Sequence, residues 1–253
     1  MNVPSQIMAI RYKRASELEA FARILDKLGI CVRSDLIYDA ATILRDKTKG
    51  FHTPDTTDYA CWGYSIEDLK IYLSELPKRH IRPSSIHSMQ IEIDIHLLCN
   101  DQHWKDQKDP LLDLNFRARI IGVDSKARYS FGYHVDRHDD SQITEEIHPV
   151  YHLQYDPLAN DDLELGSTLY LDTPRIMHVP VDLILGIDLV LSNFAPSTWQ
   201  SLRDDEDYHP LYCKYQNYLW KPYVHTWASH WSYQPQKNNW NLPLSICPYL
   251  INE

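Results

Sequence analysis

Four segments between residues 89 and 156 alternate apolar with polar side chains, and this alternation constrains the fold more than any other feature of the chain. The segments read MQIEIDIHL, LLDLNFRARI, KARYSFGYHVD and HPVYHLQYD. A period of two residues is that of a β-strand with one face buried and one face in water. The pattern therefore predicts a mainly antiparallel sheet, because such sheets tolerate one wet face.

Helical periodicity precedes these strands. Residues 14–28 place apolar side chains at helical spacing and stop before Gly29, and a second helix is expected over residues 35–47. A third helix is expected to open at Ser65, where the order Ser-Ile-Glu-Asp resembles a capping box. Residues 51–63 between them are expected to form a loop, and residues 167–172, STLYLD, a short strand.

In the segment at residues 172–194, Pro180 is expected at the start of a helix whose body is almost wholly apolar. A helix that is apolar on all sides is a buried one, so we expect it to pack on the apolar face of the sheet. Asp182 is expected in its first turn, where the helix dipole favours a carboxylate. Asp188 is expected either buried with a partner or on a solvent-facing edge.

These elements predict an α+β fold in which helices pack on a mainly antiparallel sheet over residues 90–172. A chain of 253 residues with 43% hydrophobic content can bury a sizeable core, and no repeat or low-complexity tract divides it. We therefore predict one domain. Its parts are a helical portion at residues 1–80, the sheet with its buried helix at 88–195, and an aromatic-rich extension at 196–253.

Charge, cysteine usage and missing motifs exclude several classes of protein. A net charge of −10 argues against a protein that mainly grips long nucleic acid. Five scattered cysteines without a CxxC pair favour a reducing compartment, and no apolar stretch has the length of a signal peptide or membrane span, so a cytoplasmic protein is expected. The absence of GxSxG, GxxxxGK[ST], GxGxxG and HExxH disfavours a common lipase, an ATPase, a dinucleotide dehydrogenase and a zincin.

The polar face of the predicted sheet is the best candidate for a site, because it is crowded with histidine where a merely solvated face usually recruits lysine, glutamate and threonine. If residues 122–125 close a hairpin, Asp113 lies opposite His134, and Gly132 lies between Asn115 and His152. A glycine within a strand often marks the close approach of a ligand, so a pocket is predicted around Gly132. A β-bulge is the alternative explanation of this glycine.

The side chains of this face favour acid–base chemistry without a metal over the other mechanisms considered. His134 and His152 would exchange protons with the substrate, and Asp113 would orient His134. Arg117 or Arg119 would stabilise the negative charge that develops during cleavage of a phosphodiester or nucleotide. The predicted catalytic residues are His134, His152, Arg117, Asp113, Glu92 and Asp94, and the predicted pocket residues are Asn115, Gly132, Asp136 and His148. As a solvent-accessible group, His152 is expected to contribute no more than about 1 kcal/mol to stability.

A divalent metal is the less favoured alternative, and no cofactor is expected. The run HVDRHDD resembles a set of ligands, but His134 and His138 would lie roughly 13 Å apart on a straight strand. A site built from His134 and Asp136, completed by His148 from the next strand, is sterically feasible.

The C-terminal third is rich in aromatic residues and suggests a different class of function. One helical stripe is formed by Trp220, Tyr223, Trp227 and Trp231. Such a stripe can dock a protein partner or stack bases, or it can close over the core. The sequence thus favours a hydrolase or nuclease-like enzyme, with a non-catalytic subunit that docks through this stripe as the alternative. In that alternative the polar face of the sheet is a solvent-exposed surface stabilised by cross-strand charge pairs.

Overall fold

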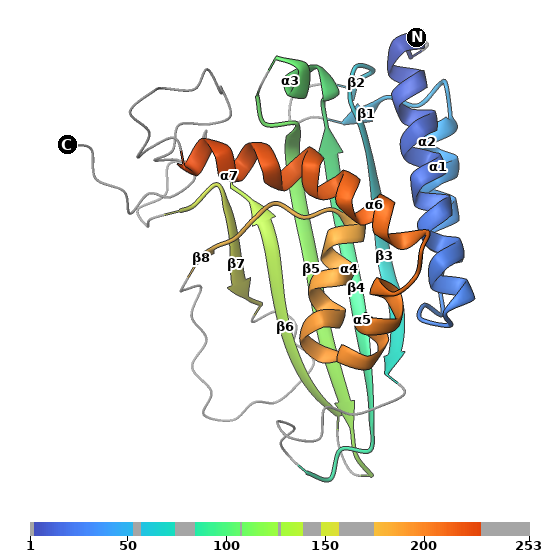
Figure 1. The fold of residues 1–253 in the computed structure, drawn as a ribbon, viewed down its shortest axis with the longest axis vertical. Helices are drawn as coiled ribbons and strands as arrows, with labels where there is room; N and C mark the ends of the chain where they lie inside the picture. Colours follow the sequence, from blue (N-terminus) through green and yellow to red (C-terminus); the bar gives the residue numbers. More distant parts are fainter. Residues whose placement is uncertain are drawn as a thin grey trace, which may run out of the picture.

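The computed structural model describes residues 3–52, 57–73, 84–106, 108–125, 128–138, 148–156 and 175–228 (Figure 1). The elements, in chain order, are α1 (Ser5–Lys27), α2 (Asp35–Arg45), β1 (Phe51–His52), β2 (Thr57–Asp58), β3 (Trp62–Leu73), β4 (Ser88–Cys99), α3 (Asp101–Lys105), β5 (Leu111–Val123), β6 (Arg128–Arg137), β7 (Tyr151–Tyr155), β8 (Ile176–Met177), α4 (Leu183–Phe194), α5 (Pro196–Arg203), α6 (Tyr208–Tyr215), the π-helical turn η2 (Gln216–Trp220) and α7 (Lys221–Ala228). The predicted α+β fold is confirmed.

The main sheet has six antiparallel strands in the order β3-β4-β5-β6-β7-β8. The four alternating segments of the sequence are its strands β4 to β7, as predicted. Ile91, Ile93 and Ile95 of β4 are at most 2% exposed, whereas the glutamate and aspartate between them are half-buried. The apolar face of the sheet is therefore the core face, and its polar face remains in contact with water.

The predicted faces are right, but the predicted strand register is wrong. Arg117 lies opposite His134, where Asp113 was expected, and Gly132 lies opposite Arg119. The displacement is four positions in both of the predicted pairings, β5 with β6 and β6 with β7. The displacement is even because alternation fixes only which face a side chain occupies. The predicted turn at residues 122–125 was too tight, since Val123 pairs with Arg128.

The predicted third helix is also wrong, because the chain from Ser65 belongs to strand β3. Its pairing with β4 shifts between Ile66 and Leu69, and both side chains are buried. This bulge inserts an extra residue, so apolar positions on one sheet face acquire the three-residue spacing of a helix. Asp68 has a φ of +60°, and its N–H donates to the Asp94 carboxylate at 2.8 Å instead of capping a helix. The predicted loop at residues 51–63 contains β1, β2 and the start of β3.

The helices cover the apolar face. Figure 1 shows α4, α5 and the segment from α6 to α7 lying across one side of the sheet, with α1 and α2 beside the β3 edge. Helix α4 is the predicted buried helix, and it packs so closely that a Cβ on Gly186 would lie 2.3 Å from the Phe116 ring. Helix α1 begins earlier than expected but ends before Gly29, whose φ is +62°.

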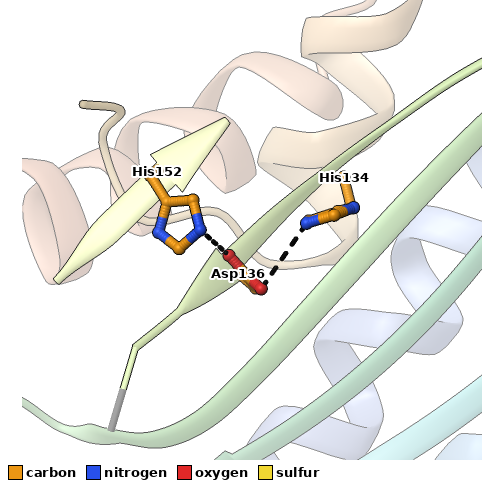
Figure 2. Close-up of side chains that lie close together, drawn as sticks. All are labelled: His134, Asp136 and His152. Atoms are coloured by element: carbon orange, nitrogen blue, oxygen red, sulfur yellow. Dashed lines mark ion pairs between the residues drawn. The ribbon is translucent and has the colours of Figure 1, made fainter. Parts of the chain in front are cut away.

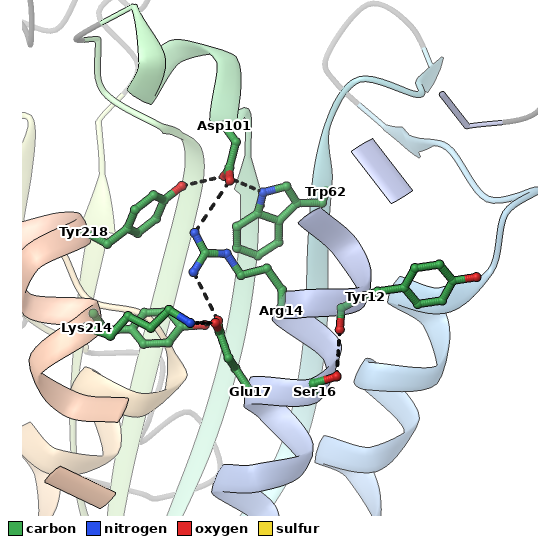
Figure 3. A network of polar contacts seen from close by, with 9 residues as sticks. Tyr12, Arg14, Ser16, Glu17, Trp62, Asp101, Lys214 and Tyr218 are labelled. Atoms are coloured by element: carbon green, nitrogen blue, oxygen red, sulfur yellow. Dashed lines mark hydrogen bonds and ion pairs between the residues drawn. The ribbon is translucent and has the colours of Figure 1, made fainter. Parts of the chain in front are cut away.

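A buried polar network joins α1 to the sheet and to the C-terminal helices (Figure 3). Arg14 contacts Glu17 at 3.1 Å and Asp101 at 3.7 Å. Asp101 accepts hydrogen bonds from Trp62 and Tyr218. These partners matter, because a buried guanidinium without them would lose its hydration with no compensation.

Two carboxylates of α4 are buried in different ways. Asp188 is buried with partners, which is one of the two predicted alternatives. Arg203 contacts both of its oxygens at 2.7 Å, and the Tyr208 hydroxyl donates to it at 2.9 Å. Asp182 is the N-cap rather than a first-turn residue, and its Oδ1 accepts from Leu185 N–H at 3.0 Å. Burial raises the pKa of Asp182 to about 7, although the backbone N–H of Leu185 and the charge of Arg14 oppose this shift.

The predicted strand at residues 167–172 lies outside the described residues. Within the part of the chain that the structure describes, no helix combines the length and apolar character needed to span a membrane.

The raised pKa of Asp182 predicts a pH-dependent effect of Asp182→Asn on stability. Between about pH 4 and pH 7 the unfolded chain loses the Asp182 proton while the folded chain keeps it, so this group stabilises the fold less as the pH rises. Asparagine keeps the cap without a charge. Urea unfolding should therefore show that the free energy of unfolding of Asp182→Asn rises relative to that of wild type between pH 5 and pH 8, by about 3 kcal/mol. Asp35→Asn, in the exposed first turn of α2, is the control; an equal difference at both pH values for Asp182→Asn would contradict the prediction.

Candidate functional site

The polar faces of β4 to β7 form one continuous surface. Asp94 lies opposite Arg117, Arg117 opposite His134, and Asp136 opposite His152. The register therefore places side chains from four strands side by side. Two features stand out on this surface: a histidine–carboxylate cluster and an open groove.

The cluster consists of His134 and Asp136 on β6 and His152 on β7 (Figure 2). His152 Nε2 lies 2.9 Å from Asp136 Oδ1, and His134 Nε2 lies 3.6 Å from Asp136 Oδ2. Residues 134 and 136 share a face because they are two apart on one strand, and antiparallel pairing brings His152 beside Asp136. Both imidazoles thus point an Nε2 atom toward the same carboxylate.

His152 is held rigidly within the fold. It is 1% exposed, and its Nδ1 lies 3.1 Å from the carbonyl oxygen of Pro149. A carbonyl can only accept, so Nδ1 carries a proton and donates it there. The expectation that His152 is solvent-accessible is therefore wrong, since the β6–β7 pairing and the turn before β7 enclose its ring.

His134 and Asp136 are more accessible, with side chains 15% and 28% exposed. Burial lowers the pKa of His134 below its ordinary value, although Asp136 and Asp156 oppose this shift, so its ring is neutral near pH 7. Burial alone would raise the pKa of Asp136, but the nearby rings of His152 and His134 outweigh burial and lower it. The cluster therefore presents an anionic carboxylate and a neutral imidazole.

Two further histidines flank the cluster. The rings of His138 and His148 stack at 4.0 Å, and the ring of His148 lies 4.7 Å from that of His152. Burial, together with His138 and Arg175, lowers the pKa of His148 to about 4. His148 was expected to complete a site with His134 and Asp136; His152 lies opposite Asp136, and His148 lies beside His152.

The groove has a volume of about 710 Å³ and is open to solvent, and it is lined by residues of β3, β4 and β5. Its polar lining residues include Asp68, Glu92, Asp94, His96, Asn115, Arg117 and Arg119. Arg117 joins the groove to the cluster, because it lies opposite His134 and pairs through Nε with the buried carboxylate of Asp156 at 2.5 Å. A molecule in the groove would therefore reach the cluster past Arg117.

The predicted site residues are only partly brought together. His134, His152, Asp136 and Arg117 form or adjoin the cluster, whereas Glu92 and Asp94 line the groove with Asn115. Glu92 is engaged by Arg119, at 2.6 and 3.0 Å.

Two predicted roles fail because of the shifted register. Asp113 does not orient His134; it lies 3.5 Å from His96. Gly132 lies opposite Arg119, its carbonyl accepts from Asp156 N–H at 2.9 Å, and it does not line the groove. The pocket predicted around Gly132 is thus displaced toward β3 to β5.

Sequence reasoning missed the β3 side of the groove and the partner of Arg117. Asp68 was assigned to the cap of the helix predicted at Ser65, and Asp156 was not among the predicted site residues. The alternation of β3 around its bulge was the available signal for Asp68. Nothing in the sequence pairs Asp156 with Arg117, because that contact depends on the register of two strand pairs.

The aromatic stripe lies mainly against the fold. Tyr223 is 1% exposed and packs on the Tyr151 ring at 5.7 Å, and Trp220 Nε1 donates to the Pro180 carbonyl at 2.8 Å. Trp227 is half-buried, and Trp231 lies outside the described residues.

The burial of His152 revises its expected contribution to stability. His152→Ala should lower the free energy of unfolding by roughly 2–4 kcal/mol, because it leaves a cavity and removes the partner of a buried carbonyl. His96→Ala, whose side chain is half exposed on the same face, should change stability by no more than about 0.5 kcal/mol. Urea unfolding of both variants measures this difference; equal midpoints would show that His152 is not buried as described.

Comparisons of the chain with models of known protein families, with curated proteins and with solved structures give no significant match.

Proposed function

We propose that this protein is a hydrolase acting on a phosphodiester or a nucleotide, with His134, Asp136 and His152 as its reactive centre. The observation that carries this proposal is the convergence of two imidazoles and a carboxylate beside an open groove. The cluster adjoins the groove through Arg117 and does not itself line it. Groups with shifted pKa values next to a concave site are candidates for a catalytic centre. The face that holds them is the one that the helices leave uncovered.

Arg117 supports an anionic substrate. Its side chain is 38% exposed, and its pairing with Asp156 is made through Nε. Among the described residues its two terminal nitrogens have no hydrogen-bond partner, so they are free to donate to a phosphate. Asp156 holds the guanidinium in place, which reduces the entropy lost when a substrate binds.

The roles within the cluster differ from those expected from the sequence. A metal-free scheme requires two imidazoles that exchange protons with the substrate. His152 is enclosed and bonded to Pro149, so it serves as a positioning residue that holds Asp136. The nucleophile is water: its oxygen bonds to phosphorus as its proton passes to the neutral ring of His134, and the ester P–O bond breaks. The departing alkoxide takes up a proton from solvent, to which His134 then returns its own.

The acidic character of the groove and chain favours a small nucleotide or a short strand over long nucleic acid. Glu67, Asp68, Glu92 and Asp94 line the groove together with two arginines. The described cysteines Cys31, Cys61, Cys99 and Cys213 form no disulfide with one another, which supports a reducing compartment such as the cytoplasm.

A non-catalytic subunit that docks through the aromatic stripe has weaker support. Tyr223 is buried, and Trp220 is hydrogen-bonded within the fold, so neither offers a free contact surface. A docking residue gains its binding energy by leaving water on association.

Hydrolysis assays test the proposal directly. The full chain should release 4-nitrophenol from bis(4-nitrophenyl) phosphate, or phosphate or nucleoside from a panel of cyclic and linear nucleotides, in buffer supplied with divalent metals. Arg117→Ala and Asp136→Asn should each lower kcat/KM by about 100-fold, because both remove a charge next to the reacting phosphate.

Arg128→Ala is the matched control, since Arg128 is an exposed arginine at the far end of β6. It should change kcat/KM by no more than about two-fold. No turnover above buffer with any substrate, or equal turnover by wild type and Asp136→Asn, would refute the proposed function.

A further inference from the structure

We infer that His134, Asp136 and His152 bind one divalent transition-metal ion of the zinc type. The inference deepens the proposed function at the same site, and its catalytic meaning rests on that function. Binding itself does not depend on hydrolysis and can be measured without a substrate.

The spacing of the donor atoms fits such an ion. One nitrogen or oxygen from each of the three residues lies within 4.8 Å of the other two. The Nε2–Oδ distances are 2.9 Å for His152 and 3.6 Å for His134. Zinc bound tetrahedrally at about 2.0–2.1 Å holds its ligand atoms about 3.4 Å apart. Small side-chain rotations are therefore enough to place all three on one ion.

The orientation of His152 is the second observation. Its Nδ1–H donates to the Pro149 carbonyl, which leaves Nε2 directed into the cluster, 2.9 Å from Asp136 Oδ1. The residue is 1% exposed, so the surrounding fold fixes the orientation of its ring. A backbone carbonyl on the other nitrogen is the usual support of a metal-bound histidine.

The ligand set indicates which metals fit. Imidazole nitrogen with one carboxylate suits zinc and its neighbours in the first transition row, whereas magnesium and calcium prefer oxygen ligands throughout. Three protein ligands leave a coordination position open for water, as in catalytic rather than structural zinc sites. The 28% exposure of the Asp136 side chain places that position toward solvent.

A bound metal would also supply an activated water for hydrolysis, which the three side chains alone lack. Zinc lowers the pKa of its water to about 7 and so provides hydroxide near neutral pH. His152 then needs no exchangeable proton, which agrees with its burial and its bond to Pro149. Arg117, opposite His134, would face the phosphate that the hydroxide attacks.

The inference is tested by titrating the chelator-treated full chain with zinc chloride, by calorimetry and in competition with a chromophoric chelator. One zinc ion should bind per chain at the cluster. Asp136→Asn and His134→Gln should each weaken that binding at least about tenfold, because each removes a direct ligand. Cobalt(II) should give a visible ligand-field spectrum that both variants lose.

His96→Gln is the matched control, because His96 also lies on the polar face, 3.5 Å from an aspartate, but outside the cluster. It should bind zinc as wild type does. Circular dichroism verifies that each variant is folded. If His134→Gln is unfolded, the zinc affinity of Asp136→Asn tests the inference, because this substitution preserves the shape of a partly exposed side chain. Absence of binding, or wild-type affinity and cobalt spectrum in Asp136→Asn, would overturn the inference.

The two proposals fail in different ways. Zinc bound at the cluster with no hydrolysis of any substrate would uphold the metal site and refute the hydrolase. Hydrolysis that depends on Asp136 but persists after complete metal removal would uphold the hydrolase and overturn the metal site.

Discussion

One-sided burial of the sheet is the constraint on which the rest of the structure depends. Alternating side chains on β4 and β5 place isoleucine, leucine and phenylalanine on a single face, and the helices remove that face from water. At roughly 25 cal/mol per Å² of apolar surface, this burial is the dominant favourable contribution to folding. The opposite face remains free to collect polar side chains without any cost to the core.

Polar groups buried among the helices and strand ends fix the position of the helical layer on the sheet. Arg14 links α1 to Asp101 after β4, and Asp109 accepts from the Tyr151 hydroxyl at 2.6 and 2.8 Å while Arg137 contacts it at 3.1 Å. The Asp109 contacts tie the end of β6 to the start of β7. They therefore help to hold the strand that carries His152, on the opposite face from Tyr151.

The site itself follows from strand pairing, because none of its three central residues could be positioned by its own strand alone. His134 and Asp136 share β6, but the third donor arrives from β7 through the pairing of Asp136 with His152. The same pairing encloses the ring of His152. The metal site that we propose is compatible with this burial, whereas an acid–base pair would require two accessible rings.

Much of the fold was predictable from residue patterns, and the failures share a physical cause. The strands β4 to β7, the buried helix α4 and the helices α1 and α2 follow from local periodicity. Strand β3 escaped detection because its bulge between Ile66 and Leu69 imitates helical spacing. Asp113 and Gly132 were given wrong neighbours because a register shift by an even number of residues leaves every face unchanged.

The sequence by itself determined which side chains share the polar face, since alternation is a local property of each strand. It also identified His134, Asp136 and His152 as members of that face. Only the tertiary structure decided which of them meet, because contact across strands depends on loop lengths, bulges and the packing of distant helices. The burial of His152, the pairing of Arg117 with Asp156 and the convergence of three donor atoms all depend on those long-range contacts.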